Sequence, residues 1–451
     1  MANPRSAVKG ISWPAVPEPV GASMLALQFQ LQQSQWWPEP ELRRHQLAQF
    51  RHLLAHAAAE TSWYAEQADF VQLAAKAEPV SDQQFRQLPR LSRRDLQQHL
   101  PRLTARSTPP AHGKRLDLAT SGSTGQPLLG YETELNHLFW GACNLRDHLW
   151  QNRNLGLKFG AIRTGVDQRQ LADWGRAISC AYQTGPATSL NINTPVERQL
   201  DWLVAEQPGY LISHASNLAA LARCSIDRGE QPTALQQVIS FGERLPDQLR
   251  DLCQQAWQVP LVDVYSAEEV GYIGLQCPVE PGNYHLMGEQ LIVEVLDHQG
   301  RPCEPGQWGQ VVITTLHNFA MPLIRYEIGD FARVGPPCPC GRGLPVLDKI
   351  MGRQRNMITL PDGSQHWPSF PADLWLAVAP INQFQLEQIS RQEIIAHYQL
   401  ERPLSADEGH NLQQRLAQSL RFPGVITLEH HRQPLTVAGS KFEDFISRLE
   451  N

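Results

Sequence analysis

The sequence predicts an α/β protein: a large N-terminal α/β domain that contains a small β-barrel-like subdomain, followed by a small C-terminal α+β domain. Three observations support this fold class. Apolar strand-like runs alternate with helical segments from about residue 116 to residue 316, which favours a mostly parallel sheet. Residues 290–316 contain two β-rich runs around a turn-rich loop, which is typical of an antiparallel hairpin. The last ~100 residues form a pattern of their own, of the size of a small domain.

The segment before residue 116 is predicted to be helical. Residues 40–64 repeat apolar side chains at the spacing of one helix face, namely Leu47, Phe50, Leu54 and Ala57, as an amphipathic helix does. Farther along, Ser92 precedes a short helical pattern. Its hydroxyl can accept a hydrogen bond from the first turn, which makes it a candidate N-cap.

The alternating segment supplies the predicted parallel sheet. Strands are expected at 209–216, 236–243 and 261–266. Helices are expected between them, at 217–229 and 245–257.

The C-terminal unit is predicted to be an α+β module. Strands are expected at 383–390, 393–400 and 424–431, a helix at 406–420, and a final helix from Phe442. We place the domain boundary around Arg353, so that the two domains are residues 1–352 and 353–451.

Composition argues against several classes of protein. The chain has 451 residues and a formal net charge of -6; with no long basic run, nucleic acid is not an expected partner. The start, MANPRSAVKGISWPAVPEPVG, lacks the continuous apolar core of a signal peptide. No uncharged apolar stretch reaches the roughly 18 residues that a membrane span requires. We therefore expect a soluble cytoplasmic protein.

The chain has 8 cysteines, which fall into two groups. Four are isolated in apolar or helical contexts and are predicted to be reduced thiols in or near the core: Cys143, Cys180, Cys224 and Cys253.

The second group of cysteines has a metal-ligand pattern. Cys277 and His285 lie close together in QCPVEPGNYHL, and Cys338 and Cys340 form a Cys-x-Cys in PPCPCGRG. Four such ligands suit a closed, structural zinc site. The alternative is ordinary thiols beside a surface histidine, and Cys303 in GRPCEPG is a lower-ranked ligand candidate.

The stretch LDLATSGSTGQP, residues 116–127, combines glycines and hydroxyl side chains between two apolar segments. Glycines let backbone N–H groups turn toward an anion, and hydroxyls add further donors. Gly125 is followed by Gln126 and Pro127 rather than by Lys and Ser or Thr, so this is not a Walker A loop. From these residues alone, the stretch could be either a phosphate-binding loop or a flexible linker.

Three further stretches carry candidate ligand groups. In VDVYSAEEVG, Tyr265 ends a strand and Glu268 and Glu269 follow in the turn, where they could hold Mg²⁺ or begin a solvated helix. Asp330 follows Gly329 in an expected turn, where it could bind ribose hydroxyls or form an Asx-turn. Lys441 follows a Gly-Ser turn and could equally be a solvated lysine.

The order of these motifs resembles the adenylate-forming superfamily: SGSTG, then GE, a Tyr and Glu turn, RYEIGD, GR and a late GSK. The closer resemblance is to its phenylacetate–CoA ligase-like branch. LPRLSRRDL, AMPLIRYEIGD, CPCGRGLPVLDKIMGR and GSKFEDF are similar to that branch's signatures. The resemblance runs from about residue 40 to the C-terminus.

The resemblance implies an ATP site. The loop that closes on the β- and γ-phosphates would be Ser121, Gly122, Ser123, Thr124 and Gly125. Glu243 in SFGERL would line the adenine pocket and Tyr265 would lie near adenine, while Asp330 and Arg353 would hold the ribose hydroxyls.

The resemblance also implies two catalytic residues, Glu269 and Lys441. Glu269 matches the magnesium-binding glutamate. Lys441 matches the lysine of a mobile C-terminal lid domain that reaches the carboxylate and the α-phosphate. Glu268 stands where the family has a small hydroxyl residue, and it would bind Mg²⁺ or point away.

The implied function is activation of a small carboxylic acid with ATP and Mg²⁺ to an acyl adenylate, with release of pyrophosphate, and then transfer to the thiol of coenzyme A. We expect an aromatic acid, because Phe139 and Trp140 could wall its pocket, although both are equally good core residues. Arg355 and Asn356 depart from the family's acidic residues after the hinge. An amine or a carrier-protein thiol is therefore an alternative acceptor of the acyl group. A non-catalytic, nucleotide-binding role is a further alternative. A homodimer is also possible from the sequence.

Overall fold

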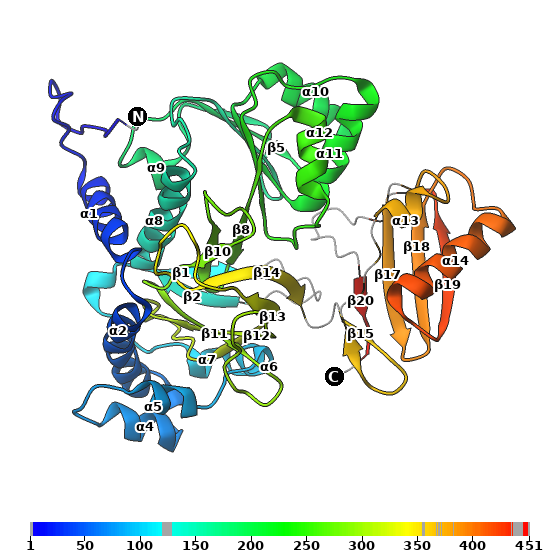
Figure 1. Ribbon diagram of the computed structural model, residues 1–451. Coiled ribbons are helices and arrows are strands. Elements are labelled where there is room, and N and C mark those ends of the chain that lie inside the picture. The colour runs from blue at the N-terminus through cyan, green and yellow to red at the C-terminus, as the bar shows by residue number, and fades with distance from the viewer. Residues whose placement is uncertain are drawn as a thin grey trace. The chain divides into compact units, whose positions relative to one another are not determined.

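The computed structural model describes residues 3–119, 129–353, 357–366, 368, 370, 372–381, 383–433, 435 and 445–449. The chain divides into two compact units, Met1–Ile350 and Met351–Asn451. Figure 1 shows a mixed α/β first unit and a smaller second unit with a four-stranded sheet. This confirms the predicted mixed α/β fold with a smaller C-terminal domain.

Helices dominate the start of the first unit. They are α1 (Pro19–Ser34), α2 (Glu39–Glu60), α3 (Ser62–Ala65), α4 (Ala68–Ala74), α5 (Asp82–Gln87), α6 (Arg93–Gln98) and α7 (Leu100–Leu103). The predicted apolar face of α2 is confirmed, since Phe50, Leu54 and Ala57 are buried. The predicted cap of α6 is also confirmed: Ser92 accepts from the backbone N–H of Asp95 within a capping box.

A short 3-10 turn, Pro110–His112, leads into a hairpin. Strands β1 (Arg115–Ala119) and β2 (Leu129–Thr133) pair antiparallel, with Arg115 opposite Thr133 and Leu118 opposite Gly130. The two apolar segments on either side of the Ser/Gly loop are therefore strands. The loop itself, residues 120–128, lies outside the described residues.

A 12-stranded sheet forms the centre of the first unit, in the order β11-β12-β13-β14-β10-β9-β8-β7-β6-β3-β5-β4. Its strands are β3 (Phe159–Arg163), β4 (Arg169–Leu171), β5 (Ala187–Asn191), β6 (Tyr210–Ser213), β7 (Gln237–Phe241), β8 (Leu261–Ala267), β9 (Gly271–Gln276), β10 (Tyr284–Leu286), β11 (Leu291–Leu296), β12 (Trp308–Thr315), β13 (Tyr326–Val334) and β14 (Val346–Arg353). Strands β5, β3, β6, β7 and β8 are parallel neighbours, as predicted.

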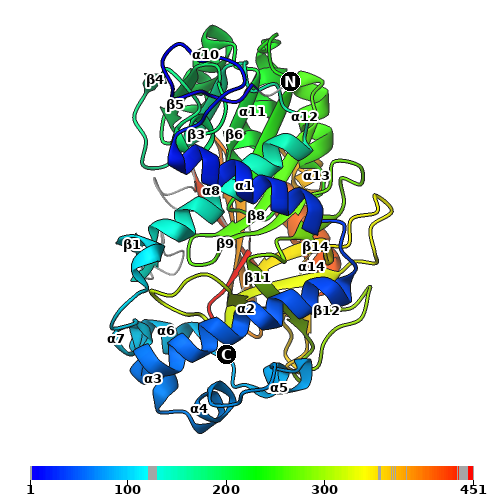
Figure 2. The ribbon, with the colours of Figure 1, turned by 90° about the vertical axis from the view of Figure 1, so that its left-hand side faces the viewer.

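Helices cover both faces of the parallel strands, which explains why most residues of these strands are buried. On one face lie α10 (Val196–Glu206), α11 (Ala215–Arg228) and α12 (Leu249–Trp257) (Figure 1). Val238 of β7 packs in their core, whereas the next residue, Ile239, packs against Cys143 of α8 (Glu134–Trp150). Helix α1 packs beside α8 (Figure 2), and the short α9 (Arg176–Ser179) also lies next to α8 (Figure 1).

The sheet continues through antiparallel strands. The hairpin predicted for residues 290–316 is β11 and β12, paired from Leu291 opposite Thr315 to Leu296 opposite Gln310. Strand β13 extends it beyond β12. Helices α2–α7 pack against these strands in one large apolar core.

The second unit has a four-stranded sheet in the order β19-β18-β17-β20. Its elements are β15 (Ile358–Thr359), β16 (Gln365–His366), α13 (Ala372–Leu376), β17 (Gln383–Ser390), β18 (Glu393–Gln399), α14 (Ala406–Leu420), β19 (Val425–His431) and β20 (Phe445–Ser447). The predicted strands and the helix 406–420 are confirmed.

The final helix predicted from Phe442 is wrong for residues 445–447. These residues form β20, which pairs parallel with β17, Leu386 opposite Phe445. Phe445 is buried in the core of the second unit. Burial and sheet pairing outweigh the local helical preference of the segment.

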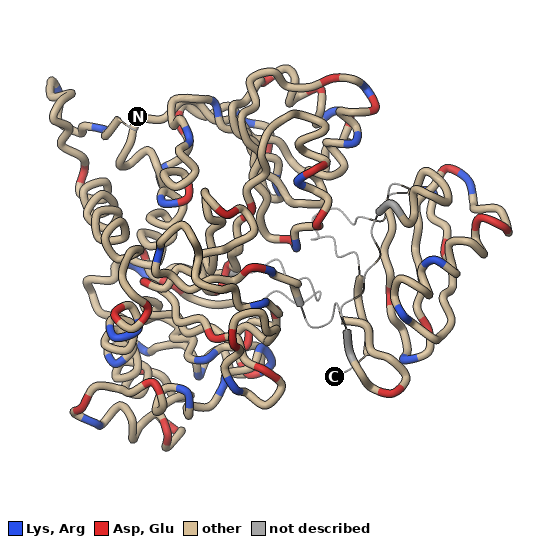
Figure 3. The backbone as a smooth tube through the Cα atoms, in the orientation of Figure 1, with Lys and Arg blue, Asp and Glu red and all other residues tan. Residues whose placement is uncertain are grey.

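Two features concern the predictions that the protein binds neither a membrane nor nucleic acid. Among the described residues, no helix is both long and apolar enough to cross a bilayer. Figure 3 shows acidic and basic residues interspersed along the described chain.

Candidate functional site

The carboxyl end of β8 gathers three of the predicted site residues. Tyr265 is buried in β8, and Glu268 and Glu269 lie in the turn after it. The Tyr265 hydroxyl donates a hydrogen bond to Oδ2 of Asp330 at 2.7 Å. The structure thus joins two motifs that are 65 residues apart, at the sheet edge where α/β proteins bind ligands.

Asp330 lies within β13 rather than in the predicted turn. The pairing of β12 and β13 is irregular here: Gln310 pairs with Phe331 and Val312 with Glu327. The extra residues of β13 form a bulge, and Gly329 has a φ of 88°, which residues with a Cβ rarely adopt. Such bulges redirect side chains beside ligand sites, and this one contains the aspartate that meets Tyr265.

Glu269 is a buried carboxylate, with its side chain 6% exposed. Nη1 of Arg93, at the start of α6, lies 3.4 Å from its Oε1. The hydroxyl of Tyr326 in β13 lies 3.5 Å from the same oxygen. Burying a carboxylate without a countercharge is costly, and the Arg93 guanidinium supplies that charge. Sequence reasoning missed Arg93, although it lies in the LPRLSRRDL motif.

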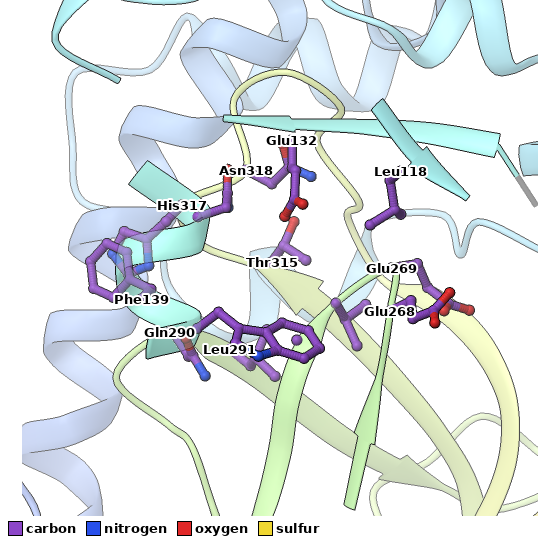
Figure 4. A pocket seen from close by; sticks show the side chains of 14 residues that line it. Leu118, Glu132, Phe139, Glu268, Glu269, Gln290, Leu291, Thr315, His317 and Asn318 are labelled. Atoms are coloured by element: carbon purple, nitrogen blue, oxygen red, sulfur yellow. The ribbon is translucent and has the colours of Figure 1, made fainter. Parts of the chain in front are cut away.

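A pocket opens beside these residues, with about 480 Å³ of space between its walls, part of it open to solvent. Figure 4 shows Glu268 and Glu269 at one end and Phe139 with His317 at the other. Phe139 and Trp140, both on α8, line the pocket, as the sequence suggested. The Phe139 ring stacks on His317 with ring centroids 4.0 Å apart. One end of the pocket is therefore aromatic and the other is acidic.

The histidine in this wall is held neutral. Burial lowers the pKa of His317 to about 4, and the nearby His112 adds to the effect. Around it, the pocket is lined by polar side chains that the sequence did not single out: Glu132, Asn136, Gln290, Thr315 and Asn318. They come from separate strands, helices and loops, so no local sequence signal groups them.

Glu243 lies in the loop after β7, next to β8 in the sheet. Its Oε2 accepts a hydrogen bond of 2.8 Å from the backbone N–H of Ser216 in the first turn of α11. A carboxylate is favourable at a helix N-terminus. This contact fixes the loop at the same sheet edge as Glu269.

The remaining predicted nucleotide-site residues cannot be placed. Lys441 and the loop residues Ser121, Gly122, Ser123, Thr124 and Gly125 lie outside the described residues. Arg353 ends β14, but its side chain also lies outside them.

Cys277, His285, Cys338 and Cys340 come together, with their four ligand atoms all within 4.8 Å of one another. The Sγ atoms of Cys277 and Cys338 are 3.7 Å apart. Sγ of Cys340 lies 3.3 Å from Nε2 of His285. Cys303 is not a member of this cluster, and its Sγ lies 3.3 Å from the carbonyl oxygen of Trp308.

Burial and hydrogen bonding shift the pKa values of three members of this cluster. Burial raises the pKa of Cys277 to about 11 and lowers that of His285 to about 4. Burial also acts to raise the pKa of Cys340, but hydrogen bonds from Arg342 outweigh it and lower that pKa. The backbone N–H groups of Val279 and Glu280 each point at Sγ of Cys277, at 3.4 Å, and such donors favour a thiolate.

The other four cysteines agree with their predicted role. Cys143, Cys180 and Cys253 are buried, Cys224 is partly buried, and all are free thiols.

The chain is similar to curated phenylacetate–coenzyme A ligases. It is 24% identical to that of Thermus thermophilus over 378 residues, 80% of this chain and 78% of the relative. It is 23% identical to that of Pseudomonas putida over 331 residues, 71% of this chain and 72% of the relative. No family model matches the chain.

Solved structures share the fold. A 2-hydroxyisobutyryl-CoA ligase in its postadenylation state superposes with a TM-score of 0.71 at 17% identity, covering 92% of this chain and 91% of that one. An anthranilate CoA ligase with anthranoyl-AMP has a TM-score of 0.52 at 15% identity, covering 72% and 64%. The fold of adenylate-forming CoA ligases is therefore confirmed, and so is the resemblance to phenylacetate–CoA ligases.

Proposed function

We propose that the protein activates a small carboxylic acid with ATP to an acyl adenylate, releasing pyrophosphate, and then transfers the acyl group to the thiol of coenzyme A. One observation carries this proposal. The Tyr265–Asp330 pair and the buried Glu269 lie together at the end of β8, beside a pocket whose far end is aromatic. The curated relatives named phenylacetate–coenzyme A ligase support it.

Each predicted residue has a role in this proposal. Asp330 and Arg353 would hold the ribose hydroxyls, with Tyr265 fixing Asp330 and lying near adenine. Glu243 would border the adenine site. The loop Ser121–Gly125 would bind the β- and γ-phosphates through its N–H and hydroxyl groups.

In the first half-reaction, a carboxylate oxygen of the acid attacks the α-phosphorus of ATP, and the bond to pyrophosphate breaks. Both reactants are anions, so positive charge must offset their repulsion. Glu269 fits a Mg²⁺ ligand, because Mg²⁺ prefers one or two carboxylates together with phosphate oxygens, and Glu268 lies at the same end of the pocket. When bound, the metal would polarise the phosphate oxygens. Arg93 holds Glu269 in place, and Lys441 would bring its charge to the carboxylate and α-phosphate.

In the second half-reaction, the thiol sulfur attacks the acyl carbonyl carbon, the thiol proton is lost and AMP leaves. We propose residues 1–352 as the domain that holds the ATP, acid and zinc sites, and residues 353–451 as a lid that moves between the two half-reactions. An amine or a carrier-protein thiol is the alternative acceptor. A non-catalytic nucleotide-binding role and a homodimer are further alternatives.

We propose an aromatic acid as the substrate. Phe139 supplies flat apolar surface at the end of the pocket away from Glu268 and Glu269, and Trp140 also lines the pocket. Aromatic side chains favour offset or edge contacts with an aryl ring. The carboxylate would then point toward the acidic end, where Mg²⁺ and Lys441 are proposed to act.

We also propose a structural zinc ion in the cluster of three cysteines and one histidine. With Zn–S bonds of about 2.3 Å, two sulfurs of a tetrahedral site lie about 3.8 Å apart. The Cys277–Cys338 separation of 3.7 Å agrees with that value. The four donors fill a tetrahedral shell and leave no position for a substrate.

The proposed function is tested with purified protein, ATP, Mg²⁺ and a panel of aryl and short apolar carboxylic acids. Acid-dependent exchange of pyrophosphate into ATP with one acid identifies the substrate, and Lys441→Ala should abolish it. Adding coenzyme A should then yield the acyl thioester and AMP. Exchange without a coenzyme A product would favour another acceptor, and no exchange with any acid would favour the nucleotide-binding alternative.

A further inference from the structure

The second unit contains a cluster of metal-ligating side chains that is separate from the cysteine cluster. It lies on two neighbouring parallel strands, where His397 of β18 pairs with Glu429 of β19, and Gln399 pairs with His431. Side chains two residues apart on a strand share a face. The sheet register therefore places His397, Glu429 and His431 on one face, while His430 lies on the opposite face with Tyr398.

The ligand atoms of His397, Glu429 and His431 all lie within 4.8 Å of one another. Nδ1 of His397 is 3.1 Å from Nε2 of His431. The Glu429 oxygens are 3.4 Å from Nδ1 of His397 and 3.6 Å from Nε2 of His431. With metal–ligand bonds of about 2.0–2.1 Å, tetrahedral geometry places donor atoms roughly 3.3–3.4 Å apart. The separations of Nδ1 of His397 from Nε2 of His431 and from Oε2 of Glu429 lie near that value, and the 3.6 Å contact of His431 is with the other Glu429 oxygen, Oε1.

A fourth side chain orients the first histidine. Nε2 of His397 lies 3.2 Å from Oε2 of Glu387 on β17, and Arg448 pairs with the other oxygen of that carboxylate. A histidine that donates one ring N–H to a carboxylate presents the other nitrogen to a metal, as ligating histidines commonly do. Here that other nitrogen is Nδ1, which faces His431 and Glu429.

We propose that His397, Glu429 and His431 bind a divalent transition-metal ion, such as Zn²⁺, Co²⁺ or Ni²⁺, with Glu387 as the residue that positions His397. Imidazole ligands favour these metals over Mg²⁺ and Ca²⁺. Three protein ligands leave at least one position for water, and the side chains of Glu429 and His431 are 52% and 34% exposed. The ion would link β19, at the sheet edge, to β18.

The proposal is tested by adding Co²⁺ to tag-free, full-length protein freed of metal by chelation. Thiolate ligands give Co²⁺ an intense ligand-to-metal charge-transfer band that histidine and carboxylate ligands lack. Cobalt bound at the cysteine cluster is therefore counted by absorbance, and total bound cobalt by equilibrium dialysis and metal analysis. We expect about one more Co²⁺ per chain than the thiolate band accounts for.

Variants locate that additional ion. His431→Gln and Glu429→Gln should lose it and keep the thiolate band, and Glu387→Gln should weaken it about 10- to 100-fold. His430→Gln, which changes the adjacent histidine on the opposite face, is the matched control and should keep it. The proposal is overturned if the wild type binds no cobalt beyond the thiolate site, if His431→Gln and Glu429→Gln retain the additional ion, or if His430→Gln loses it. Circular dichroism on each variant confirms that the sheet is folded, and because Glu429→Gln preserves side-chain size, it serves if His431→Gln is unstable.

Discussion

The hydroxyl of Tyr265 donates a 2.7 Å hydrogen bond to Oδ2 of Asp330, and this contact links β8 to the bulge in β13. The two strands are not neighbours in the sheet, so the bond joins them through side chains rather than through the backbone ladder. It holds one of the two acceptor oxygens of Asp330 in a fixed direction. Asp330 is only partly buried, as its proposed contact with the ribose hydroxyls requires.

Tyr265→Phe tests this bridge. Removing the hydroxyl takes this hydrogen bond from Asp330 without opening a cavity, and a hydrogen bond to a charged group contributes about 1.5–3 kcal/mol. We expect the KM for ATP to rise roughly 10- to 150-fold, with a smaller change in kcat and little loss of thermal stability. Steady-state kinetics with varied ATP measure this split. An unchanged KM for ATP would remove the bridge from the account of nucleotide binding.

Cys338→Ser tests the zinc cluster, with Cys303→Ser as the matched control, since Cys303 lies outside it. Purified wild-type protein should contain about one zinc per chain in this site. Cys338→Ser should lose that zinc and unfold at a lower temperature, whereas Cys303→Ser should keep both the metal and the melting temperature. Metal analysis and calorimetry measure the outcome. Equal zinc contents in the two variants would contradict the site.

His317 gives the fold a pH dependence. Its pKa is lowered to about 4 by burial in the wall of the pocket, whereas an unfolded histidine has a pKa of about 6.5. As the pH falls through this window, the unfolded chain takes up a proton before the folded one does, so the free energy of unfolding decreases, by roughly 2–3 kcal/mol at about pH 4.

His317→Gln should remove this component. Groups that do not contact His317, such as His285, titrate equally in the wild type and the variant, so the difference between the two unfolding free energies should narrow or reverse on acidification. Urea unfolding followed between about pH 7 and pH 4 measures the difference. A constant difference over that range would show that His317 does not titrate as described.

Arg325 is expected to be a stability determinant. Its guanidinium pairs with Glu294 through Nε–Oε2 and Nη2–Oε1 distances of 2.9 and 3.0 Å and donates to the carbonyl oxygen of Leu88 at 2.6 Å. Both ionic side chains are buried. Arg325→Met leaves the Glu294 charge unpaired and should cost about 3–5 kcal/mol of the free energy of unfolding.

The double variant Arg325→Met with Glu294→Leu is the control for this pair. It removes both charges, and we expect it to recover part of the loss. Chemical denaturation of the single and double variants gives the two free energies. If the double variant is less stable than the single one, charge burial is not the cause of the loss.

Much of the fold could be predicted from the sequence, because the periodicity is strong. The parallel strands, the 290–316 hairpin and the helix 406–420 each have a clear period bounded by turn residues. Strand β20, residues 445–447, could not be predicted in this way. Three residues carry no periodic signal, and their pairing with β17 depends on the fold of the whole second unit. Asp330 was placed in a turn because Gly329 favours one, whereas a strand accommodates that glycine in a bulge.

The candidate site was predictable only in part. The zinc ligands could be found because cysteine pairs in Gly/Pro-rich loops are poor core residues. Arg93 could not be found from the sequence, because its contact with Glu269 joins segments 176 residues apart. The cluster of His397, Glu429 and His431 likewise depends on the register of two parallel strands, and no local spacing reveals it.

The most direct test of the proposed function is the acid-dependent ATP–pyrophosphate exchange of the wild type, Glu269→Gln and Glu268→Gln. Glu269 is the buried carboxylate held by Arg93, whereas Glu268 is exposed. We predict exchange by the wild type with an aromatic acid, a decrease of roughly 10²- to 10³-fold in Glu269→Gln, and a much smaller change in Glu268→Gln. Absence of exchange in the wild type with every acid, or full exchange in Glu269→Gln, would contradict the proposed adenylation.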